Sequence, residues 1–300
     1  MRILITGAAG QIGSAVTTYL HEQGHDVVAT DVDYRQGLPC RLHLVDLCDT
    51  FAVYPLVEGC DAVIQLGNHP NARTARPAQK LLVDNVAMNS HVFYAAVDVG
   101  VRRIIGISSV QATTGMHGSK AWSPNGRECA WPYLPADGKL PRNPGNNTYA
   151  LSKVFAERTL EALTEEYVDL AAVAVRFPYV VPARANKFRR YNHGVRLNDH
   201  RLSEGLSYLS MADACTSLQA IVERMTPGYR QAFVAQSLKI RGMSYAEMAE
   251  RFYPQLQVTG PLDTAGGLID LRAMQDHYGW SPAGPALEVD FVEDEPGNHP

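Results

Sequence analysis

Three glycines spaced three residues apart lie close to the start of the chain, at Gly7, Gly10 and Gly13. They follow a short apolar run, Arg2–Thr6, and precede a helix-like stretch from Ser14 to Gln23. A strand, a tight glycine turn and a helix in this order bring backbone N–H groups and a helix N-terminus to a place where a pyrophosphate can bind. The spacing therefore predicts a nucleotide-binding α/β fold.

The residues of this turn differ in what they are expected to do. Gly7 lets the chain leave the strand sharply. Gly10 leaves room for a phosphate beside the backbone, and Gly13 allows the helix to pack close to the sheet. Gln11 and Ile12 stand between the last two glycines and belong to the same predicted cofactor-binding turn.

An acidic residue follows the next apolar run, which covers Asp26–Thr30. The carboxylate of Asp31 can accept both hydroxyls of an adenosine ribose and would repel a 2′-phosphate, so the sequence favours NAD over NADP. Arg35 is the residue expected to take over if Asp31 points elsewhere. The alternative is that the glycines only mark turns. It does not explain why the strand, the helix and Asp31 stand at the spacing of a nucleotide-binding motif.

Composition excludes several classes of protein. The 300 residues carry a formal net charge of −4 and no Lys/Arg run stands out, so nucleic acid is not an expected partner. No apolar run approaches the roughly 18 residues of a membrane span. The five cysteines form no CxxC pair, and no signal peptide is recognised. We therefore expect reduced thiols, no metal site and a cytoplasmic location.

Short apolar runs alternate with helical stretches over roughly the first 180 residues. Such alternation predicts a doubly wound parallel Rossmann sheet. Further strands are expected at Arg41–Val45, Ala62–Leu66, Arg103–Ser108 and Leu170–Arg176, and long helices at Ala78–Val99 and Thr148–Glu166. We expect residues 1–178 to form the nucleotide-binding domain, with later segments returning to it, and residues 179–300 to form mainly a smaller substrate-binding lobe.

Two stretches interrupt this alternation. Residues 116–147 are rich in Gly, Pro and Asn and contain Trp122 and Trp131. Because ordered loops of this length are usually functional, we expect a lid whose tryptophans contact the substrate. Residues 182–205 are rich in Arg, Asn and His and are expected to begin the substrate lobe, with an exposed connector as the alternative.

Tyr149 and Lys153 are four residues apart in a predicted helix and therefore lie on one face. An ammonium group there, beside an oxidised nicotinamide, would lower the pKa of Tyr149 from about 10 towards the working pH. The tyrosine can then take a proton from a substrate hydroxyl while the carbon of that hydroxyl gives hydride to NAD. An accidental pair on a surface helix is the alternative.

Two serines end the predicted fifth strand, at the edge where open α/β sheets bind their ligands. A serine hydroxyl at this edge can hydrogen-bond the reacting oxygen and hold it near Tyr149. Ser109, one step further into the loop, is the predicted catalytic serine, and Ser108 is the alternative.

With these motifs the chain resembles the extended short-chain dehydrogenases/reductases of the NAD-dependent epimerase/dehydratase type over nearly its whole length. The resemblance implies NAD as cofactor and a homodimer formed through helices at 80–99 and 148–166. It also implies cofactor contacts at Asp46, Leu47, Leu66, Gly67, Asn68, Asn85, Tyr149, Lys153 and Phe177.

Departures from the family pattern reduce the number of reactions expected of this chain. Val110 and Gln111 stand where related dehydratases carry an acid pair, so elimination of water lacks its acid and base. Thr114 takes the place of a tyrosine typical of epimerases. Tyr179 takes the place of an asparagine usual in nucleotide-sugar enzymes, which argues against a nucleotide sugar as substrate.

The segments Leu66–Pro70 and Tyr208–Ser210 look closer to uronate dehydrogenases, which act on free sugar acids. We therefore expect an NAD-dependent oxidoreductase that takes hydride from a secondary alcohol or hemiacetal carbon of a sugar or sugar acid. The alternatives are a nucleotide-sugar 4-epimerase that uses bound NAD, and a non-catalytic NAD-binding sensor.

Candidate substrate contacts are Ser109, Gln111, Tyr179 and Arg184. Arginines bind carboxylates and phosphates with two parallel hydrogen bonds, and further arginines that could line the site are Arg73, Arg76, Arg189, Arg190 and Arg196. Three histidines are expected to be loop residues rather than ligands, namely His69, His193 and His200.

Overall fold

The computed structural model describes residues 1–70, 77–115, 129–181, 194–195 and 200–292. Seven parallel strands form the central sheet: β1 (Arg2–Thr6), β2 (Asp26–Asp31), β3 (Leu42–Leu44), β4 (Ala62–Gln65), β5 (Arg103–Ser109), β7 (Ala171–Phe177) and β10 (Gly228–Phe233). Their order across the sheet is β10-β7-β5-β4-β1-β2-β3. The order therefore reverses between β1 and β4, which is where a doubly wound sheet binds its ligand.

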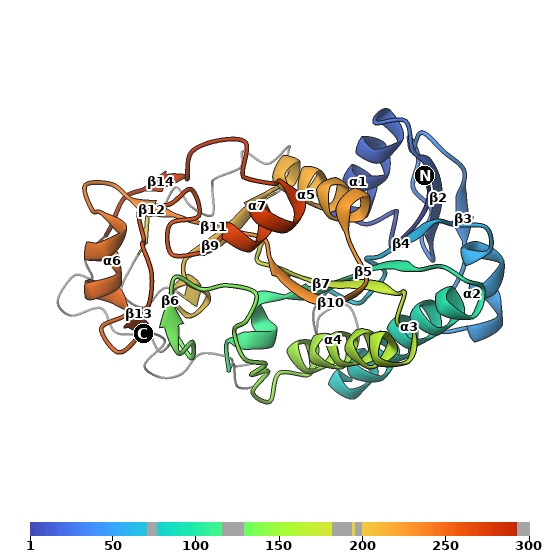
Figure 1. Cartoon of the computed structure of the whole chain (residues 1–300), viewed down its shortest axis with the longest axis horizontal. Helices are drawn as coiled ribbons and strands as arrows, with labels where there is room; N and C mark the ends of the chain where they lie inside the picture. The colour runs from blue at the N-terminus through green and yellow to red at the C-terminus, as the bar shows by residue number, and fades with distance from the viewer. Residues whose placement is uncertain (71–76, 116–128, 182–193, 196–199, 293–300) are drawn as a thin grey trace.

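Helices cover both faces of this sheet (Figure 1). They are α1 (Gln11–Glu22) and α5 (Met211–Arg224) on one face, and α2 (Thr50–Val57), α3 (Ala78–Asp98) and α4 (Thr148–Glu166) on the other. Alternation along β1 divides the core between them. Ile3 and Ile5 pack in the cluster that includes α1 and α5, and Leu4 packs in the cluster that includes α3 and α4.

Smaller elements gather beyond the carboxyl ends of the strands (Figure 1). They are β6 (Tyr133–Leu134), β8 (Val180–Val181), β9 (Ser207–Ser210), β11 (Gln236–Ser237), β12 (Lys239–Ile240), α6 (Tyr245–Phe252), β13 (Gln257–Val258), α7 (Arg272–Tyr278) and β14 (Glu288–Val289). Two short 3₁₀ helices, η1 (Val110–Thr113) and η2 (His200–Glu204), also lie near this end. No helix in the described ranges is long and apolar enough to cross a bilayer, and the five cysteines carry free thiols.

The structure confirms the α/β class, the parallel sheet and the two long helices, with element ends that differ from the predictions by a few residues. Ser109 is the last residue of β5 rather than a loop residue. The helix after the glycine turn begins at Gln11, three residues before the predicted start, because it follows Gly10 directly. The edge strand β10 was not among the predicted strands.

The prediction of a tryptophan lid is wrong for Trp131. Its side chain is buried, its indole N–H donates to the Thr113 hydroxyl at 2.9 Å, and its ring packs edge-on against Phe233. Trp131 therefore belongs to the core between the sheet and the smaller elements, and it is not free to contact a sugar. Trp122 lies outside the described residues.

Candidate active site

The turn between β1 and α1 is too crowded for side chains at its first and last glycines. Gly7 has a φ of +64°, a conformation that favours glycine. A Cβ on Gly13 would lie 2.0 Å from the carbonyl oxygen of Gly7, and a Cβ on Gly7 would lie 2.9 Å from the backbone of Gly67. At Gly10 the nearest atom, again the Gly7 carbonyl oxygen, would be 3.1 Å away. The turn thus brings the start of α1 against the ends of β1 and β4.

Among the described residues, no side chain caps the N-terminus of α1, which leaves the N–H groups of its first turn for a ligand. Asp31, at the end of β2, lies over the same turn and accepts the Ala9 N–H at 2.8 Å. The guanidinium of Arg35 donates to the Ala9 carbonyl at 2.9 Å. These groups fit the pyrophosphate and ribose of a dinucleotide, with an acidic and a basic side chain both close to the ribose position.

The end of β4 is fixed by hydrogen bonds to β1. The Thr6 hydroxyl oxygen accepts the N–H groups of Leu66 at 3.0 Å and Gly67 at 2.9 Å. Leu47 is buried, and its side chain lies 2.7 Å from where a Cβ on Gly67 would stand. Asp46 is exposed beside it, with one carboxylate oxygen accepting the Cys48 N–H. Four of the predicted cofactor residues are therefore neighbours along this edge.

Asn85 on α3 forms hydrogen bonds within the protein. Its amide oxygen accepts the His69 N–H at 2.8 Å, and its amide N–H groups donate to the His69 carbonyl and the Ser152 hydroxyl, both at 3.1 Å. Asn85 is fully buried. It therefore ties the segment after β4 to α4, while its contact with cofactor stays a prediction.

Tyr149 and Lys153 lie in the first turns of α4, as the spacing predicted. The Asn147 side chain caps this helix by accepting the Tyr149 N–H at 3.0 Å. The buried ammonium of Lys153 donates to the Asn68 amide oxygen at 2.6 Å and to the Ile107 carbonyl at 2.9 Å. It lies 5.4 Å from the centre of the Tyr149 ring. Lys153 thus joins α4 to the ends of β4 and β5.

Burial has the largest effect on the pKa values of Tyr149 and Lys153. Burial lowers the pKa of Lys153 to about 7. Burial also raises the pKa of Tyr149 to about 12, against a hydrogen bond from Ser109 that lowers it, while the charge of Glu204 raises it further. In the protein by itself, loss of solvent outweighs the neighbouring groups. The expected lowering of the Tyr149 pKa beside Lys153 and a bound nicotinamide stays a prediction.

The structure distinguishes the two candidate serines. The Ser108 hydroxyl donates to the Glu157 carboxylate at 2.7 Å and is buried on the opposite side of β5. The Ser109 hydroxyl shares a hydrogen bond with Tyr149 and accepts the Gln111 N–H at 3.2 Å. Ser109 is therefore the serine that lies next to the tyrosine.

Glu204, which sequence reasoning missed, completes this side of the site. Its carboxylate accepts a hydrogen bond from the Gln111 amide at 3.3 Å, and the Gln111 amide oxygen accepts one from Asn147 at 3.4 Å. Gln111 thus connects the cap of α4 to η2. Glu204 stands 93 residues after Gln111 in a segment without a motif, so no sequence signal pointed to it.

The structure says less about the roles of the remaining predicted residues. Phe177 is buried at the end of β7, and Tyr179 is 42% exposed just beyond it. His69 pairs with Asp84 at 3.1 Å. Several predicted residues lie outside the part of the chain that the structure describes, namely Arg73, Arg76, Arg184, Arg189, Arg190, Arg196 and His193.

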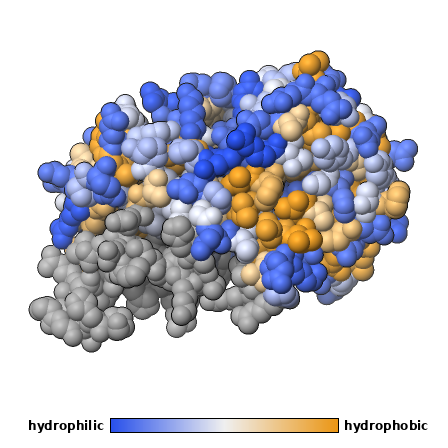
Figure 2. Space-filling view, turned by 90° about the horizontal axis from the view of Figure 1, so that it is seen from below, coloured by the Kyte–Doolittle hydropathy of each residue, from blue (hydrophilic) through white to orange (hydrophobic). Residues whose placement is uncertain are grey.

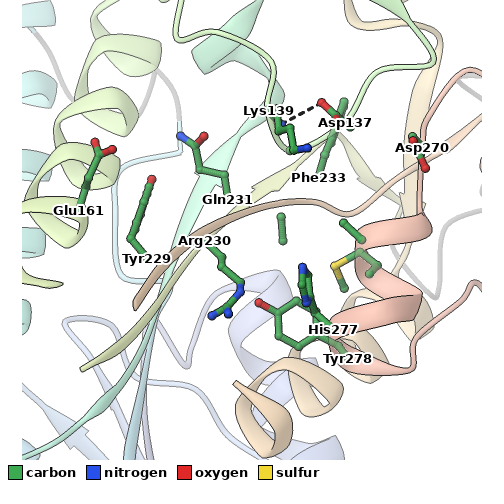
Figure 3. A pocket seen from close by; sticks show the side chains of 14 residues that line it. Asp137, Lys139, Glu161, Tyr229, Arg230, Gln231, Phe233, Asp270, His277 and Tyr278 are labelled. Atoms are coloured by element: carbon green, nitrogen blue, oxygen red, sulfur yellow. Dashed lines mark hydrogen bonds between the residues drawn. The ribbon is translucent and has the colours of Figure 1, made fainter. Parts of the chain in front are cut away.

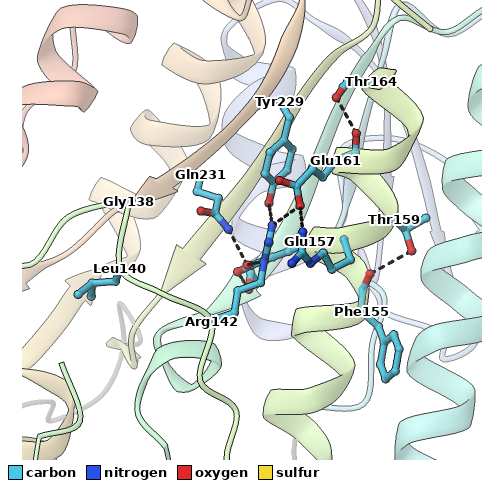
Figure 4. A network of polar contacts seen from close by, with 12 residues as sticks. Gly138, Leu140, Arg142, Phe155, Glu157, Thr159, Glu161, Thr164, Tyr229 and Gln231 are labelled. Carbon is cyan, nitrogen blue, oxygen red and sulfur yellow. Dashed lines mark hydrogen bonds and ion pairs between the residues drawn. The ribbon is translucent and has the colours of Figure 1, made fainter. Parts of the chain in front are cut away.

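A buried ionic network centred on Glu157 (Figure 4) lies on the side of β5 to which Ser108 points. Glu157 and Arg176 are both fully buried and form two hydrogen bonds, at 2.8 and 2.9 Å. Arg142 and Gln231 also donate to the Glu157 carboxylate, at 2.9 and 2.8 Å. Burial alone would raise the pKa of Glu157, but the hydrogen bonds and charge of Arg176 bring it below its usual value. The network joins α4, β5, β7 and β10.

Glu157 could have been suspected from the sequence. It follows Lys153 by four residues, as Lys153 follows Tyr149, so all three lie on one stripe of α4. Its partner Arg176 also donates to the carbonyl groups of Gly138 and Leu140, at 3.3 and 2.7 Å. The pair therefore fixes the helix that carries the tyrosine, the strand that carries the serine, and the loop between them.

The chain is similar to several known proteins. A uronate dehydrogenase of Pseudomonas syringae pv. tomato is 28% identical over 189 residues, which is 62% of this chain and 62% of that protein. The chain thus matches about three-fifths of the length of this relative. The solved glucuronic acid dehydrogenase of Chromohalobacter salexigens is 25% identical with a TM-score of 0.57, covering 78% of this chain and 76% of the other.

A UDP-glucose 4-epimerase of Bifidobacterium longum, solved with NAD⁺ and UDP, has the same fold. Its TM-score is 0.66 over 93% of each chain, at 16% sequence identity. The model of the NAD dependent epimerase/dehydratase family matches residues 3–197, which include the glycine turn, Ser109, Tyr149 and Lys153. This chain therefore belongs to the NAD dependent epimerase/dehydratase family.

Proposed function

We propose that this protein is an NAD-dependent oxidoreductase that takes hydride from a secondary alcohol or hemiacetal carbon of a sugar or sugar acid. The observation that carries the proposal is the arrangement of Ser109, Tyr149 and Lys153 beside the glycine turn. A uronate or a related sugar acid is the preferred substrate class, supported by the similarity to uronate dehydrogenases.

In the proposed reaction the Ser109 hydroxyl holds the reacting oxygen of the substrate close to the phenol of Tyr149. NAD, when bound, supplies the hydride acceptor and a positively charged ring. Tyr149 takes the proton of the substrate hydroxyl, which needs its phenolate form and therefore a pKa below the value set by burial alone. Lys153, already tied to Asn68 and Ile107, keeps the tyrosine-bearing helix in place and offers its ammonium to the nicotinamide ribose.

A substrate panel tests this function. Uronates, free aldoses and nucleotide sugars are each mixed with the protein and NAD, and NADH is followed by its absorbance. We expect turnover with at least one uronate or aldose. Turnover of none of these classes in the presence of NAD would contradict the proposed function.

A nucleotide-sugar 4-epimerase is the second candidate, favoured by the fold similarity over 93% of the chain to an epimerase. An epimerase returns the hydride within one site and has no need to release its cofactor. NAD that remains bound through purification, together with epimerisation of a nucleotide sugar without net NADH, would support this candidate. Rapid exchange of NAD would support the dehydrogenase.

Cofactor choice gives a first quantitative prediction. Asp31 accepts the Ala9 N–H and is placed to accept the ribose hydroxyls, so the protein should bind NAD more tightly than NADP by at least about tenfold, the effect of one lost charged hydrogen bond. Calorimetric titration of both cofactors at the same salt concentration measures the ratio. Equal or tighter binding of NADP would mean that Arg35, which contacts the same turn, binds the 2′-phosphate instead.

The charge of Glu204 gives a prediction about pH. Its negative charge raises the pKa of Tyr149, so Glu204→Gln should lower that pKa and make the phenolate available at lower pH. The acid limb of the kcat/KM profile should then move to lower pH. Glu165→Gln, an exposed change on α4, is the matched control and should leave the profile in place. A shift to higher pH in Glu204→Gln would contradict the assignment.

We also propose that the protein forms a homodimer through α3 and α4. Val83 and Tyr94 on α3 and Phe155 on α4 are 63%, 48% and 47% exposed, and apolar side chains gather on the face of the molecule seen in Figure 2. Phe93, which lies within the helix 80–99 expected at this interface, is fully buried in the core. Light scattering at micromolar concentration should give twice the chain mass, and Phe155→Glu should give the monomer. A wild-type monomer would contradict this.

A further inference from the structure

A cavity of about 320 Å³ lies at the open edge of the central sheet, between β10, α4, α7 and the segment around Gly138 (Figure 3). Strand β10 pairs with β7, and no strand of the described segments pairs with its other side. The residues that line the cavity include none from the glycine turn and none of Ser109, Tyr149 and Lys153. Its size is within the range of small-molecule sites, and the proposed reaction does not use it.

Basic side chains at this cavity have unused hydrogen-bonding capacity. Arg230, half-buried on β10, makes one described hydrogen bond, from Nη1 to the Thr226 carbonyl at 3.1 Å. The ammonium of Lys139 forms no ion pair or hydrogen bond with another described residue. The imidazole of His277 is exposed on α7, and its ring lies 6.0 Å from that of Tyr278, centre to centre. All three side chains line one cavity. The charge of Lys139 also stabilises the Asp270 carboxylate, so Arg230 is the cation with the most capacity left for a ligand.

The carboxylates in the wall are already bound. Asp270 pairs with Arg272 at 2.6 Å, and Glu161 pairs with two arginines, at 2.9 and 2.8 Å. Asp137 accepts the Tyr133 hydroxyl at 2.7 Å and a backbone N–H at 2.9 Å. The described carboxylates of the wall are therefore bound to other groups, and Arg230 keeps donors for an anion.

A buried hydroxyl gives a second, independent indication. Tyr278 is 3% exposed, and its hydroxyl makes no hydrogen bond with any other described group. Figure 3 shows this hydroxyl directed toward the side chain of Arg230. Buried polar groups without a partner are unfavourable and uncommon. If the Arg230 guanidinium shifts to admit a ligand, a ligand oxygen bound to it can accept a hydrogen bond from the Tyr278 hydroxyl.

We propose that this cavity binds a small organic anion, a carboxylate or a phosphate monoester on a ring-sized apolar body. Arg230 binds the charged oxygens, because a guanidinium is among the strongest donors to such groups, and Lys139 adds positive charge on the other side of the cavity (Figure 3). Phe233 and Met274 form the apolar wall against which the body of the ligand packs. The site is separate from the cofactor and substrate positions and needs neither of them.

Calorimetric titration into NAD-saturated protein tests the proposal with benzoate, phenyl phosphate and neutral benzyl alcohol. At least one of the two anions should bind at one site with a Kd of about 1 mM or tighter, a range that ligands of this size reach. Benzyl alcohol should bind about tenfold more weakly. The preferred anion identifies which of the two oxygen groups the site accepts.

Matched variants place the binding in the cavity. Arg230→Gln should weaken binding of the anion by about tenfold. Lys139→Gln changes an exposed loop residue and should weaken binding severalfold. Arg224→Gln removes the same charge from an exposed residue at the end of α5 and should change nothing. The proposal would be overturned if Arg230→Gln and Lys139→Gln left the affinity for the anion unchanged, or if Arg224→Gln lowered it equally. It would also be overturned if neither anion bound at roughly 10 mM.

Discussion

Replacing Tyr149 by phenylalanine is expected to lower kcat by about 10²–10⁴-fold, the usual contribution of a general base. The change removes one oxygen and keeps the ring, so the packing of α4 should survive. NAD should still bind, because the glycine turn and the Lys153 contacts with Asn68 and Ile107 do not depend on the phenol. The measurement is steady-state turnover of whichever substrate the panel identifies, together with calorimetric NAD binding.

Two further variants control this prediction. Ser109→Ala should cost less than Tyr149→Phe, because water can replace one hydrogen bond to the substrate oxygen. Lys153→Met should weaken NAD binding as well as turnover, since it breaks the contacts between α4 and the ends of β4 and β5. A Tyr149→Phe protein that keeps more than about a tenth of the wild-type rate would refute the role of the tyrosine.

Replacing Glu157 by alanine is expected to lower the free energy of unfolding by about 3–5 kcal/mol, because it leaves the fully buried guanidinium of Arg176 without its carboxylate. Urea unfolding followed by circular dichroism measures the loss. Because the pKa of Glu157 is lowered in the folded protein, its contribution is present above the pKa of the unfolded chain. That contribution is lost as the pH falls through the folded value.

The control for Glu157 lies on the same helix. Glu165→Ala removes an exposed carboxylate from α4 and should change stability by no more than about 0.5 kcal/mol. The double change Glu157→Leu with Arg176→Met should recover part of the lost stability, because no buried charge is left unpaired. Equal losses in Glu157→Ala and Glu165→Ala would show that the ionic network does not stabilise the fold.

The sequence predicted which side chains are neighbours where the residues lie close together along the chain. The glycine turn, Asp31 and the Tyr149–Lys153 pair each depend on spacing within one strand, turn or helix, where backbone geometry decides which side chains are neighbours. The parallel sheet followed from the alternation of apolar runs and helices for the same reason. The sequence also pointed to both serines at the end of β5.

The tertiary structure decided what depends on distant segments. It assigned Ser108 to Glu157 and Ser109 to Tyr149, because the two serines point to opposite sides of one strand. It brought Glu204 to Gln111 across 93 residues.

The glycine turn and the tyrosine–lysine pair could be read from the sequence because each depends on spacing within one turn or helix. The parallel sheet could be read because apolar runs alternate with helical stretches along the chain. The place of Trp131 in the core and the open edge at β10 were decided only by the tertiary structure. Burial also set the direction of the Tyr149 pKa. Burial and contacts between distant segments arise when helices and strands pack, and local sequence patterns do not encode that packing.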